Sequence, residues 1–267
     1  MELNLSIVLI IAYLLVGATA GIFAGLLGLG GGIIIVPALF FIFMKQGLST
    51  DILMHMAVAT SLTTIIFTAI SSTWAHHCHG AVRWPVVGLL VPGIIAGCIT
   101  GAFVADQLKS DNLRIAFAVF EILVALQVAF NIKPSAKMVL PGKFVMMVAG
   151  AVIGTLSTLL GIGGGTMTVP FLLWRNENIR NAVATSSACG LPIAIAGTTG
   201  MIVTGWNHVA LPAWSTGYVY WPAAIGIMVA SVLTAPLGAK LAHTLPINTL
   251  KKVFAVVIGL IGIRMLV

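Results

Sequence analysis

The sequence predicts an all-α polytopic membrane protein with two pseudo-symmetric repeats. Three observations lead to this prediction. Charged residues are 7% and apolar residues 60% of the 267 residues, and the mean hydropathy is +1.13. Soluble domains carry roughly a quarter charged residues, so this composition excludes an ordinary soluble domain. Apolar stretches long enough to cross a bilayer recur along the chain, and a glycine-rich segment occurs twice.

The repeated segment is a glycine-rich interruption of apolar sequence. Residues 17–37 read GATAGIFAGLLGLGGGIIIVP and residues 150–170 read GAVIGTLSTLLGIGGGTMTVP, with 11 of 21 positions identical. The motif Ala-Val-Ala-Thr-Ser at 57–61 returns at 182–186. The order of the motifs is the same each time, which indicates an internal duplication.

The duplication defines the expected domain organisation. The motif Gly-x-Val-x-Trp-Pro at 80–85 returns at 217–222, and shorter matches continue beyond it. We therefore expect a first transmembrane repeat over 1–131 and a second over 144–267. The segment 132–143 contains two prolines and three lysines, which is typical of a surface linker.

The apolar stretches predict the membrane spans. A span needs about 20 residues to cross a ~30 Å hydrocarbon core. The predicted full-length spans are 5–27, 52–75, 83–107, 111–131, 180–204, 216–243 and 247–266. The apolar segments that follow the glycine breaks, 33–44 and 166–174, measure only about 18 and 14 Å as helices. Each glycine region is therefore either one interrupted span or a re-entrant hairpin.

The distribution of Lys and Arg distinguishes these two models. If each glycine region crosses, the chain has eight spans and parallel repeats, and the basic residues divide eight to five between the two faces. If each is a re-entrant hairpin, the repeats are inverted and the division is nine to four. The positive-inside rule favours the second model. Both models place the two termini outside the cell.

Other features of the sequence fit a multi-pass membrane protein. The six tryptophans fall at predicted segment ends, as interfacial anchors do. The three cysteines have unrelated spacings, so no disulfide framework is expected. The start lacks a basic region, so a cleaved signal peptide is not expected. The net charge of +7 is spread over predicted membrane-edge loops, and no nucleic-acid partner is expected.

The glycine breaks are the candidate substrate site. Four glycines in five residues permit positive φ and let backbone N–H groups face a ligand, and the short helix that follows has its positive end within the membrane. Such a site binds an anion without a buried Lys or Arg. The alternative is close helix packing through small residues. The candidate binding residues are Gly28, Gly30, Gly31, Gly32, Gly161, Gly163, Gly164 and Gly165.

Hydroxyl groups follow each break at matching positions. Thr60 and Ser61 in the first repeat, and Thr185 and Ser186 in the second, are candidates to donate to the same ligand. The alternative is hydrogen bonding to a carbonyl within their own helix.

Two basic residues precede these motifs. His55 and Arg180 occupy matching positions and are candidates to attract an anion at an entrance, although they also fit ordinary membrane-edge residues.

Two further features are outside the duplicated pattern. Glu121 lies well inside the predicted span 111–131, and an ionisable group there is a candidate for proton coupling or a buried structural glutamate. The run His76-His77-Cys78-His79 resembles a metal cluster, but consecutive helical residues diverge and no second ligand group is evident. We expect no metal site, no cofactor and no catalytic residues.

The duplicated glycine segment closed by Val-Pro, the Ala-Val-Ala-Thr-Ser motif and the Gly-x-Val-x-Trp motif together resemble the sulfite exporter TauE/SafE family. The resemblance covers nearly the whole chain. It implies a protein of the bacterial inner membrane, not an enzyme, that moves small sulfur-containing anions such as sulfite and organosulfonates. It also implies that the glycine segments and the Thr-Ser pairs bind the substrate.

The expected function is therefore secondary transport or export of a small oxyanion by alternating access between two halves. The alternatives are a passive small-anion channel, a metal transporter or an intramembrane enzyme using the His76–His79 segment. Membrane lipids are expected neighbours, and the sequence is compatible with a homo-oligomer.

Overall fold

The computed structural model describes residues 2–27, 31–130, 142–244 and 247–267. In these residues the chain forms ten helices and one small hairpin. The elements are α1 (Glu2–Leu27), α2 (Gly32–Lys45), α3 (Leu53–Cys78), α4 (Trp84–Gln107), α5 (Ser110–Ala129), α6 (Lys143–Leu160), α7 (Gly165–Trp174), α8 (Ile179–Thr204), β1 (Ser215–Thr216), β2 (Val219–Tyr220), α9 (Trp221–Thr244) and α10 (Ile247–Leu266).

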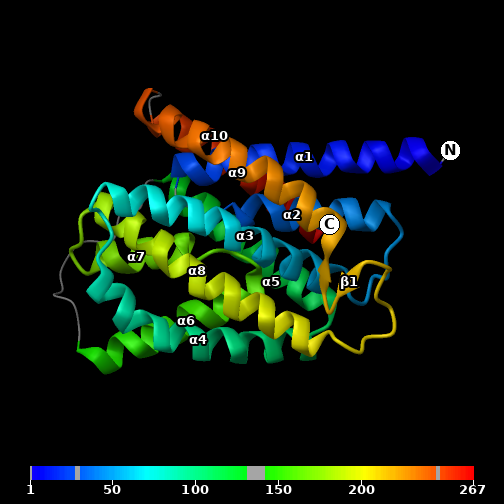
Figure 1. Cartoon of the computed structure of the whole chain (residues 1–267), viewed down its shortest axis with the longest axis horizontal. Coiled ribbons are helices and arrows are strands. Elements are labelled where there is room, and N and C mark those ends of the chain that lie inside the picture. Colours follow the sequence, from blue (N-terminus) through cyan, green and yellow to red (C-terminus); the bar gives the residue numbers. More distant parts are fainter. Residues whose placement is uncertain (1, 28–30, 131–141, 245–246) are drawn as a thin grey trace.

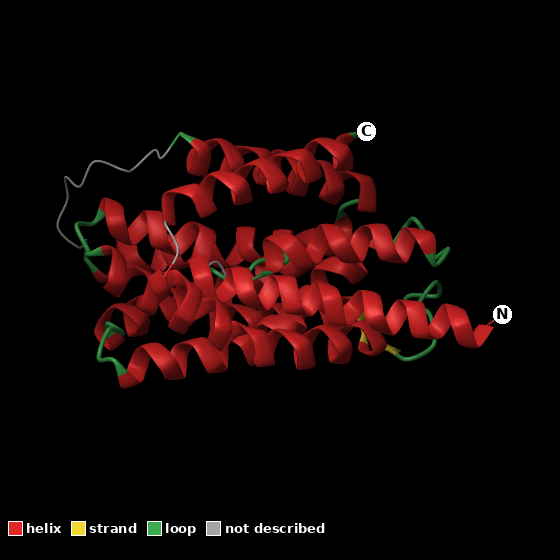
Figure 2. Ribbon diagram, turned by 90° about the horizontal axis from the view of Figure 1, so that it is seen from above, coloured by secondary structure: helices red, strands yellow, loops and turns green. Residues whose placement is uncertain are grey.

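The prediction of an all-α polytopic membrane protein is confirmed. Seven of the described helices are long and apolar enough to cross a membrane. The helices lie side by side along the long axis of the molecule (Figure 2). The short helices expected after the two glycine breaks are present as α2 and α7.

The predicted start of one span lies too early in the sequence. The span expected over 216–243 starts only at Trp221, because the residues before it form an antiparallel hairpin in which Ser215 pairs with Tyr220 and Thr216 with Val219. Gly217 makes the turn with a φ of 54°, a conformation that glycine adopts without strain.

The glycine breaks turn the chain back on itself. A Cβ on Gly31, just before α2, would lie 3.3 Å from the carbonyl oxygen of Ala20 in α1. Beyond the end of α2, Gln46 Nε2 donates to the hydroxyl of Tyr13 at 2.6 Å. Since α2 moves backward along α1 between these contacts, the two helices form an antiparallel hairpin.

The second break does the same from the other end of the molecule. The α6 helix begins beside the start of α4, where Gly93 packs against the backbone of Met147. The α7 helix ends near Glu177, which forms an ion pair with Arg83, just before α4. The chain therefore leaves this end along α6 and returns to it along α7.

The three helices that follow each hairpin run between the two ends of the bundle. The start of α1 and the end of α10 lie toward one end, together with the loop before α3 and the hairpin before α9 (Figure 1). The end of α5, the start of α6 and the α3–α4 loop lie at the opposite end. In the centre α3 packs against α8, and 83% of the residues in the most apolar stretch of α3 are buried.

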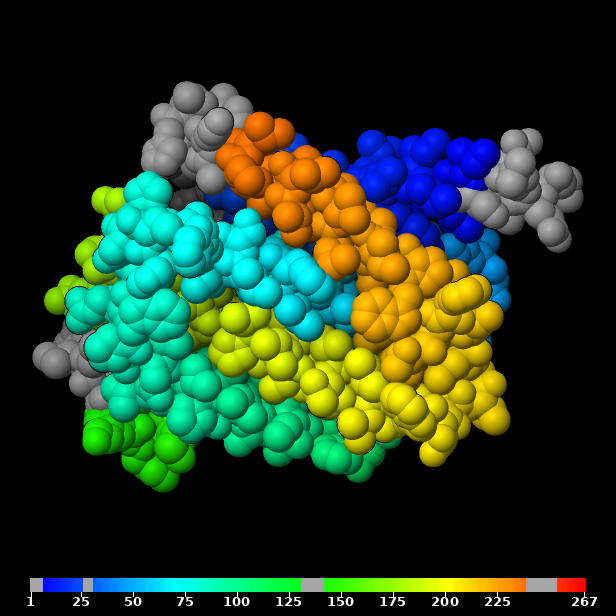
Figure 3. Space-filling model, viewed as in Figure 1, coloured from blue at the N-terminus to red at the C-terminus, as the bar shows by residue number. Residues whose placement is uncertain are grey.

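The outer helices pack through glycines that bring backbones into contact. A Cβ on Gly17 of α1 would meet the carbonyl oxygen of Ile227 in α9, and a Cβ on Gly150 of α6 would meet that of Leu90 in α4. The residue pairs 17/150 and 90/227 are those matched by the sequence duplication. Helices from the two sequence halves are therefore interleaved, as Figure 3 shows for α9 (orange) beside α1 (blue).

We expect the α4–α6 contact to be intolerant of any side chain at its glycines. Gly97→Ala places a methyl group against the backbone of Ala151, and overpacking of this kind costs about 1–3 kcal/mol. The control is Gly88→Ala on the same helix, where nothing lies within 4 Å. Thermal unfolding in detergent should show a lower midpoint for the first variant only; equal midpoints would contradict the described packing.

The direction of the helices predicts which loops share a face of the membrane. In a Cys78→Ser background, we expect Thr50→Cys and Val209→Cys to react with an impermeant thiol reagent from one face, and Lys143→Cys from the other. All three positions are exposed. If each glycine region instead crossed the bilayer, position 209 would be labelled from the same face as position 143 and from the face opposite to position 50.

Candidate functional site

The described parts of the two glycine breaks are in direct contact. A Cβ on Gly32 would lie 2.5 Å from the carbonyl oxygen of Gly161 and 2.9 Å from Cα of Ile162. Gly161 ends α6 with a φ of 65°, and a Cβ there would lie 2.8 Å from Cγ2 of Val36. The contact therefore requires glycine on both sides. Gly28 and Gly30 lie outside the described residues.

Two helices begin at this contact. Gly31 caps α2 in the left-handed conformation with a φ of 74°, and Gly164 caps α7. The N–H groups of Gly32 and Ile33, in the first turn of α2, donate to no backbone carbonyl within the described residues. Free N–H groups and the positive end of the helix dipole favour an anion.

The glycines of the second break, Gly161, Gly163, Gly164 and Gly165, are all buried. A Cβ on Gly164 would lie 2.7 Å from Cδ1 of Ile193 and 4.0 Å from the backbone nitrogen of Gly190, both on α8. The start of α7 is therefore enclosed by α8.

The Thr-Ser motifs connect the two sequence halves reciprocally. Thr60 accepts a hydrogen bond from the N–H of Tyr220 at 3.1 Å, and Thr185 accepts one from the N–H of Arg83 at 3.1 Å. Arg83 and Tyr220 hold the same position in the repeated Gly-x-Val-x-Trp-Pro motif. Each threonine thus binds the backbone of the other half, and each hydroxyl keeps its own proton for a further bond.

The serines of these motifs differ from each other. Ser61 donates to the carbonyl oxygen of Gly161 at 2.8 Å, so it joins α3 directly to the second break. Ser186 is fully buried, and its hydroxyl has no hydrogen-bond partner in the part of the chain that the structure describes.

The structure adds three hydroxyl groups that the sequence analysis missed. Ser157, Thr166 and Thr168 are buried near the second break, and none has a hydrogen-bond partner among the described residues. The signal for two of them was present as a departure from the duplication, since Thr166 and Thr168 match Ile33 and Ile35 of the first repeat.

The two candidate entrance residues lie at opposite ends of the molecule. His55 is buried at the start of α3, and its Nε2 lies 2.9 Å from the carbonyl oxygen of Ala105 and 3.1 Å from that of Leu108. These contacts attach α3 to the corner between α4 and α5. Arg180 is exposed at the start of α8, at the other end.

A tyrosine completes the surroundings of His55. The ring of Tyr218 lies 5.1 Å from the ring of His55, and its hydroxyl donates to Asp106 Oδ1 at 2.8 Å. Burial raises the pKa of Tyr218, and the hydrogen bond to Asp106 raises it further. The phenol therefore stays protonated and holds the loop before β2 against α4.

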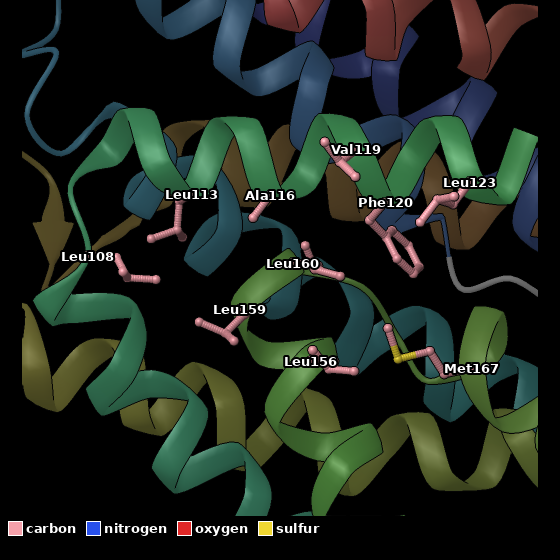
Figure 4. Close-up of a pocket in the computed structure, with 10 residues that line it drawn as sticks. All are labelled: Leu108, Leu113, Ala116, Val119, Phe120, Leu123, Leu156, Leu159, Leu160 and Met167. Carbon is pink, nitrogen blue, oxygen red and sulfur yellow. The ribbon is translucent and has the colours of Figure 1, made fainter.

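Glu121 is fully buried on α5, and neither carboxylate oxygen has a hydrogen-bond partner among the described residues. Its Cβ lies 3.5 Å from the position that a Cβ on Gly262 of α10 would take. Its neighbour Phe120 lines an apolar pocket with Leu160 and Met167, which flank the second break (Figure 4). The helix that contains Glu121, α5, therefore passes beside the second break.

The pocket in Figure 4 lies between α5 and the α6–α7 junction. All ten of its lining side chains are apolar. It offers no polar side chain to an oxyanion. It lies beside the second glycine break, and none of its lining residues is a predicted site residue.

The His76–His79 segment forms the end of α3 and the turn after it. Trp84 Nε1 lies 3.2 Å from His77 Nδ1, and His79 Nδ1 lies 2.7 Å from the carbonyl oxygen of Ala75. Within the described residues, no group of three or more His, Cys, Asp or Glu side chains is arranged to hold a metal ion.

Comparison with known proteins agrees with this architecture. The family model described as "Sulfite exporter TauE/SafE" matches residues 13–265. A "Probable membrane transporter protein" of Haemophilus influenzae is 38% identical, over 96% of this chain and 97% of its own length. The "Probable membrane transporter protein YunE" of Bacillus subtilis is 29% identical over 94% of each chain. No solved structure matches the chain.

The family match covers almost the whole chain, and the relatives are similar over nearly their full lengths. Both relatives are named as probable membrane transporters, in agreement with the apolar helical bundle described above. The chain is a membrane transporter that belongs to the sulfite exporter TauE/SafE family.

Proposed function

We propose that this transporter exports a small sulfur-containing oxyanion, sulfite or an organosulfonate, across the bacterial inner membrane by alternating access. The substrate binds where the two glycine breaks meet. The observation that carries this proposal is the backbone contact between Gly32 and Gly161, which brings two helix interruptions from distant parts of the sequence to one place in the bundle.

Electrostatics supports an anion at this place. Among the described residues, the buried ionisable side chains of the acidic or basic kind are His55 and Glu121, and no buried Lys or Arg is present to bind an anion. The start of α2 supplies a positive dipole end instead, with N–H groups at Gly32 and Ile33 that have no backbone partner among the described residues. Because membrane potential is negative inside, it favours exit of an anion by about 2.3 kcal/mol per charge per 100 mV.

The helix directions support inverted repeats with external termini. Each half contributes a hairpin that starts and ends at the same end of the molecule, followed by three helices that we assign as crossings. The inverted arrangement assigns nine of the thirteen Lys and Arg residues to one face, which the positive-inside rule makes cytoplasmic. Inverted repeats with broken helices at a central site are a common transporter design.

Burial of the breaks supports alternating access over an open channel. Residues 31–33 and 160–166 are all buried. A solute reaches them from either face only when the surrounding helices move, and such a cycle saturates at high substrate concentration. A passive channel is the alternative, and its flux would not saturate.

The substrate is tested with purified protein in proteoliposomes. We expect saturable flux of at least one of sulfite, thiosulfate, taurine or sulfoacetate, with acetate as a control anion without sulfur. Flux that rises linearly with concentration would favour the channel. The proposal is wrong if the protein carries none of these sulfur compounds and no sulfate.

The glycine breaks are tested by substitution with leucine. We expect Gly31→Leu and Gly164→Leu each to lower flux at least tenfold, because a side chain at 31 is strained at a φ of 74° and one at 164 collides with Ile193. Gly47→Leu is the matched control, since Gly47 also has a positive φ, 71°, but nothing lies within 4 Å. All three variants should reach the membrane, and wild-type flux in the first two would discredit the glycine site.

Glu121 is the candidate for proton coupling. A charged carboxylate without a partner is costly inside a membrane, so the side chain is expected to bind a proton during part of the cycle. Glu121→Gln keeps the shape and removes the titration. If Glu121 couples, the variant should lose stimulation by a pH gradient and retain substrate exchange at equal pH on both sides. Unchanged stimulation would show that Glu121 is structural.

A further inference from the structure

We propose that the two glycine breaks are unequal, and that the second break coordinates the oxyanion through side-chain hydroxyls of Thr166, Thr168, Ser186 and Ser157. This inference rests on the proposed anion function and adds the residues that determine its specificity. In this arrangement the first break lies on the other side of the bound oxyanion and contributes the N–H groups at the start of α2.

The unpartnered hydroxyls are the first observation. Ser157, Thr168 and Ser186 are completely buried and Thr166 is 8% exposed, yet none of these four oxygens has a hydrogen-bond partner among the described residues. Buried polar groups are almost always hydrogen-bonded, because leaving one without a partner is costly.

Other buried hydroxyls in the bundle show what usually happens. Thr63 donates to the carbonyl oxygen of Ala59 at 2.9 Å, and Thr64 donates to that of Ser61 at 2.7 Å, both within α3. This is the ordinary arrangement for Ser and Thr in an apolar helix. The four hydroxyls near the second break depart from it, as those of Thr158 and Thr198 also do, and their position at the start of α7 makes them available for a ligand.

The position of these hydroxyls is the second observation. Thr168 Oγ1 lies 3.1 Å from the place that a Cβ on Gly164 would take, so it lies directly over the residue that caps α7. Ser186 lies on the same face of α8 as Gly190 and Ile193, the two α8 residues that lie within 4 Å of that same place. Ser157 lies in the last turn of α6, four residues before Gly161.

The asymmetry of the duplication is the third observation. At the matching positions of the first repeat, Thr166 and Thr168 are replaced by Ile33 and Ile35, and Ser157 by Ala24. Both isoleucines are buried. The first break is therefore apolar where the second carries hydroxyls, although the glycines are the same.

The chemistry fits an oxyanion with several acceptor oxygens. Each hydroxyl supplies one donor, and the N–H groups near the helix start supply more. Donors placed at the positive end of α7 interact with an anion more favourably than with a cation. Sulfite and sulfonate headgroups both present three oxygens, so both fit, whereas a carboxylate presents only two.

The test compares hydroxyl removal in the second break with matched controls. We expect Thr168→Val and Thr166→Val each to raise the KM for the transported oxyanion about tenfold, with a similar rise in the Kd of the purified protein. Thr168→Ser, which keeps the hydroxyl, should restore most of the affinity. Thr63→Val, whose hydroxyl is satisfied within α3, and Ile35→Val at the matching position of the first break should stay within twofold of wild type.

The outcomes separate this inference from the proposed function. If the wild-type protein carries a sulfur oxyanion but Thr168→Val and Thr166→Val keep its KM and Kd, the asymmetric site is wrong and the transport proposal stands. If the wild-type protein carries none, the transport proposal fails first. If wild-type transport depends on Na⁺ and the variants lose this dependence while the KM for the oxyanion is unchanged, the hydroxyls coordinate a cation, and the inference is overturned. Thermal midpoints of all variants check that each is folded.

Discussion

The contact between the two helix breaks is the constraint on which the rest of the structure depends. At Gly32 and Gly161 the backbones of α2 and α6 approach so closely that neither residue has room for a Cβ. Lipid does not satisfy interrupted backbone, so a break within a membrane is tolerated only where protein or a cavity receives it. Here each break receives the other, and Ser61 binds the Gly161 carbonyl oxygen from α3.

Glycine has two different roles in this bundle. Along the α1–α9 and α4–α6 contacts, glycines such as Gly17 and Gly150 let straight helices pack backbone to backbone, as small residues commonly do in membranes. At the breaks, Gly31 and Gly161 adopt positive φ and end or begin helices. The first role holds the bundle together, and the second places the starts of α2 and α7 at the breaks. The two interpretations of the glycine segments are therefore compatible within one chain.

The polar contacts show how the duplicated halves depend on each other. Thr60 and Thr185 each accept a backbone hydrogen bond from the Gly-x-Val-x-Trp-Pro motif of the opposite half. The packing of α1 with α9 and of α4 with α6 likewise pairs helices from different halves. Bodies that move against each other during transport would therefore be combinations of helices from both halves, rather than the two sequence repeats as separate units.

Much of the fold was predictable from the sequence, because apolar length and glycine breaks are local signals. The helix boundaries agree within a few residues for most spans, and the short helices after the breaks are present. The hairpin at Ser215–Tyr220 was missed because no charged residue separates it from the span that begins at Trp221, and the turn at Gly217 is its main local signal. The candidate site was predicted less completely, since hydrogen-bond partners of Ser and Thr depend on the neighbouring helices.

The sequence by itself determined the membrane class, the duplication, the positions of the breaks and the family, because each follows from composition, period or motif along the chain. Only the tertiary structure decided that the breaks touch, that Thr60 and Thr185 bind the backbone of the opposite half, and that Thr166 and Thr168 lack partners among the described residues. The physical reason is that satisfaction of a buried polar group is a property of what surrounds it. For Thr60 and Thr185 those surroundings come from residues more than 100 positions away.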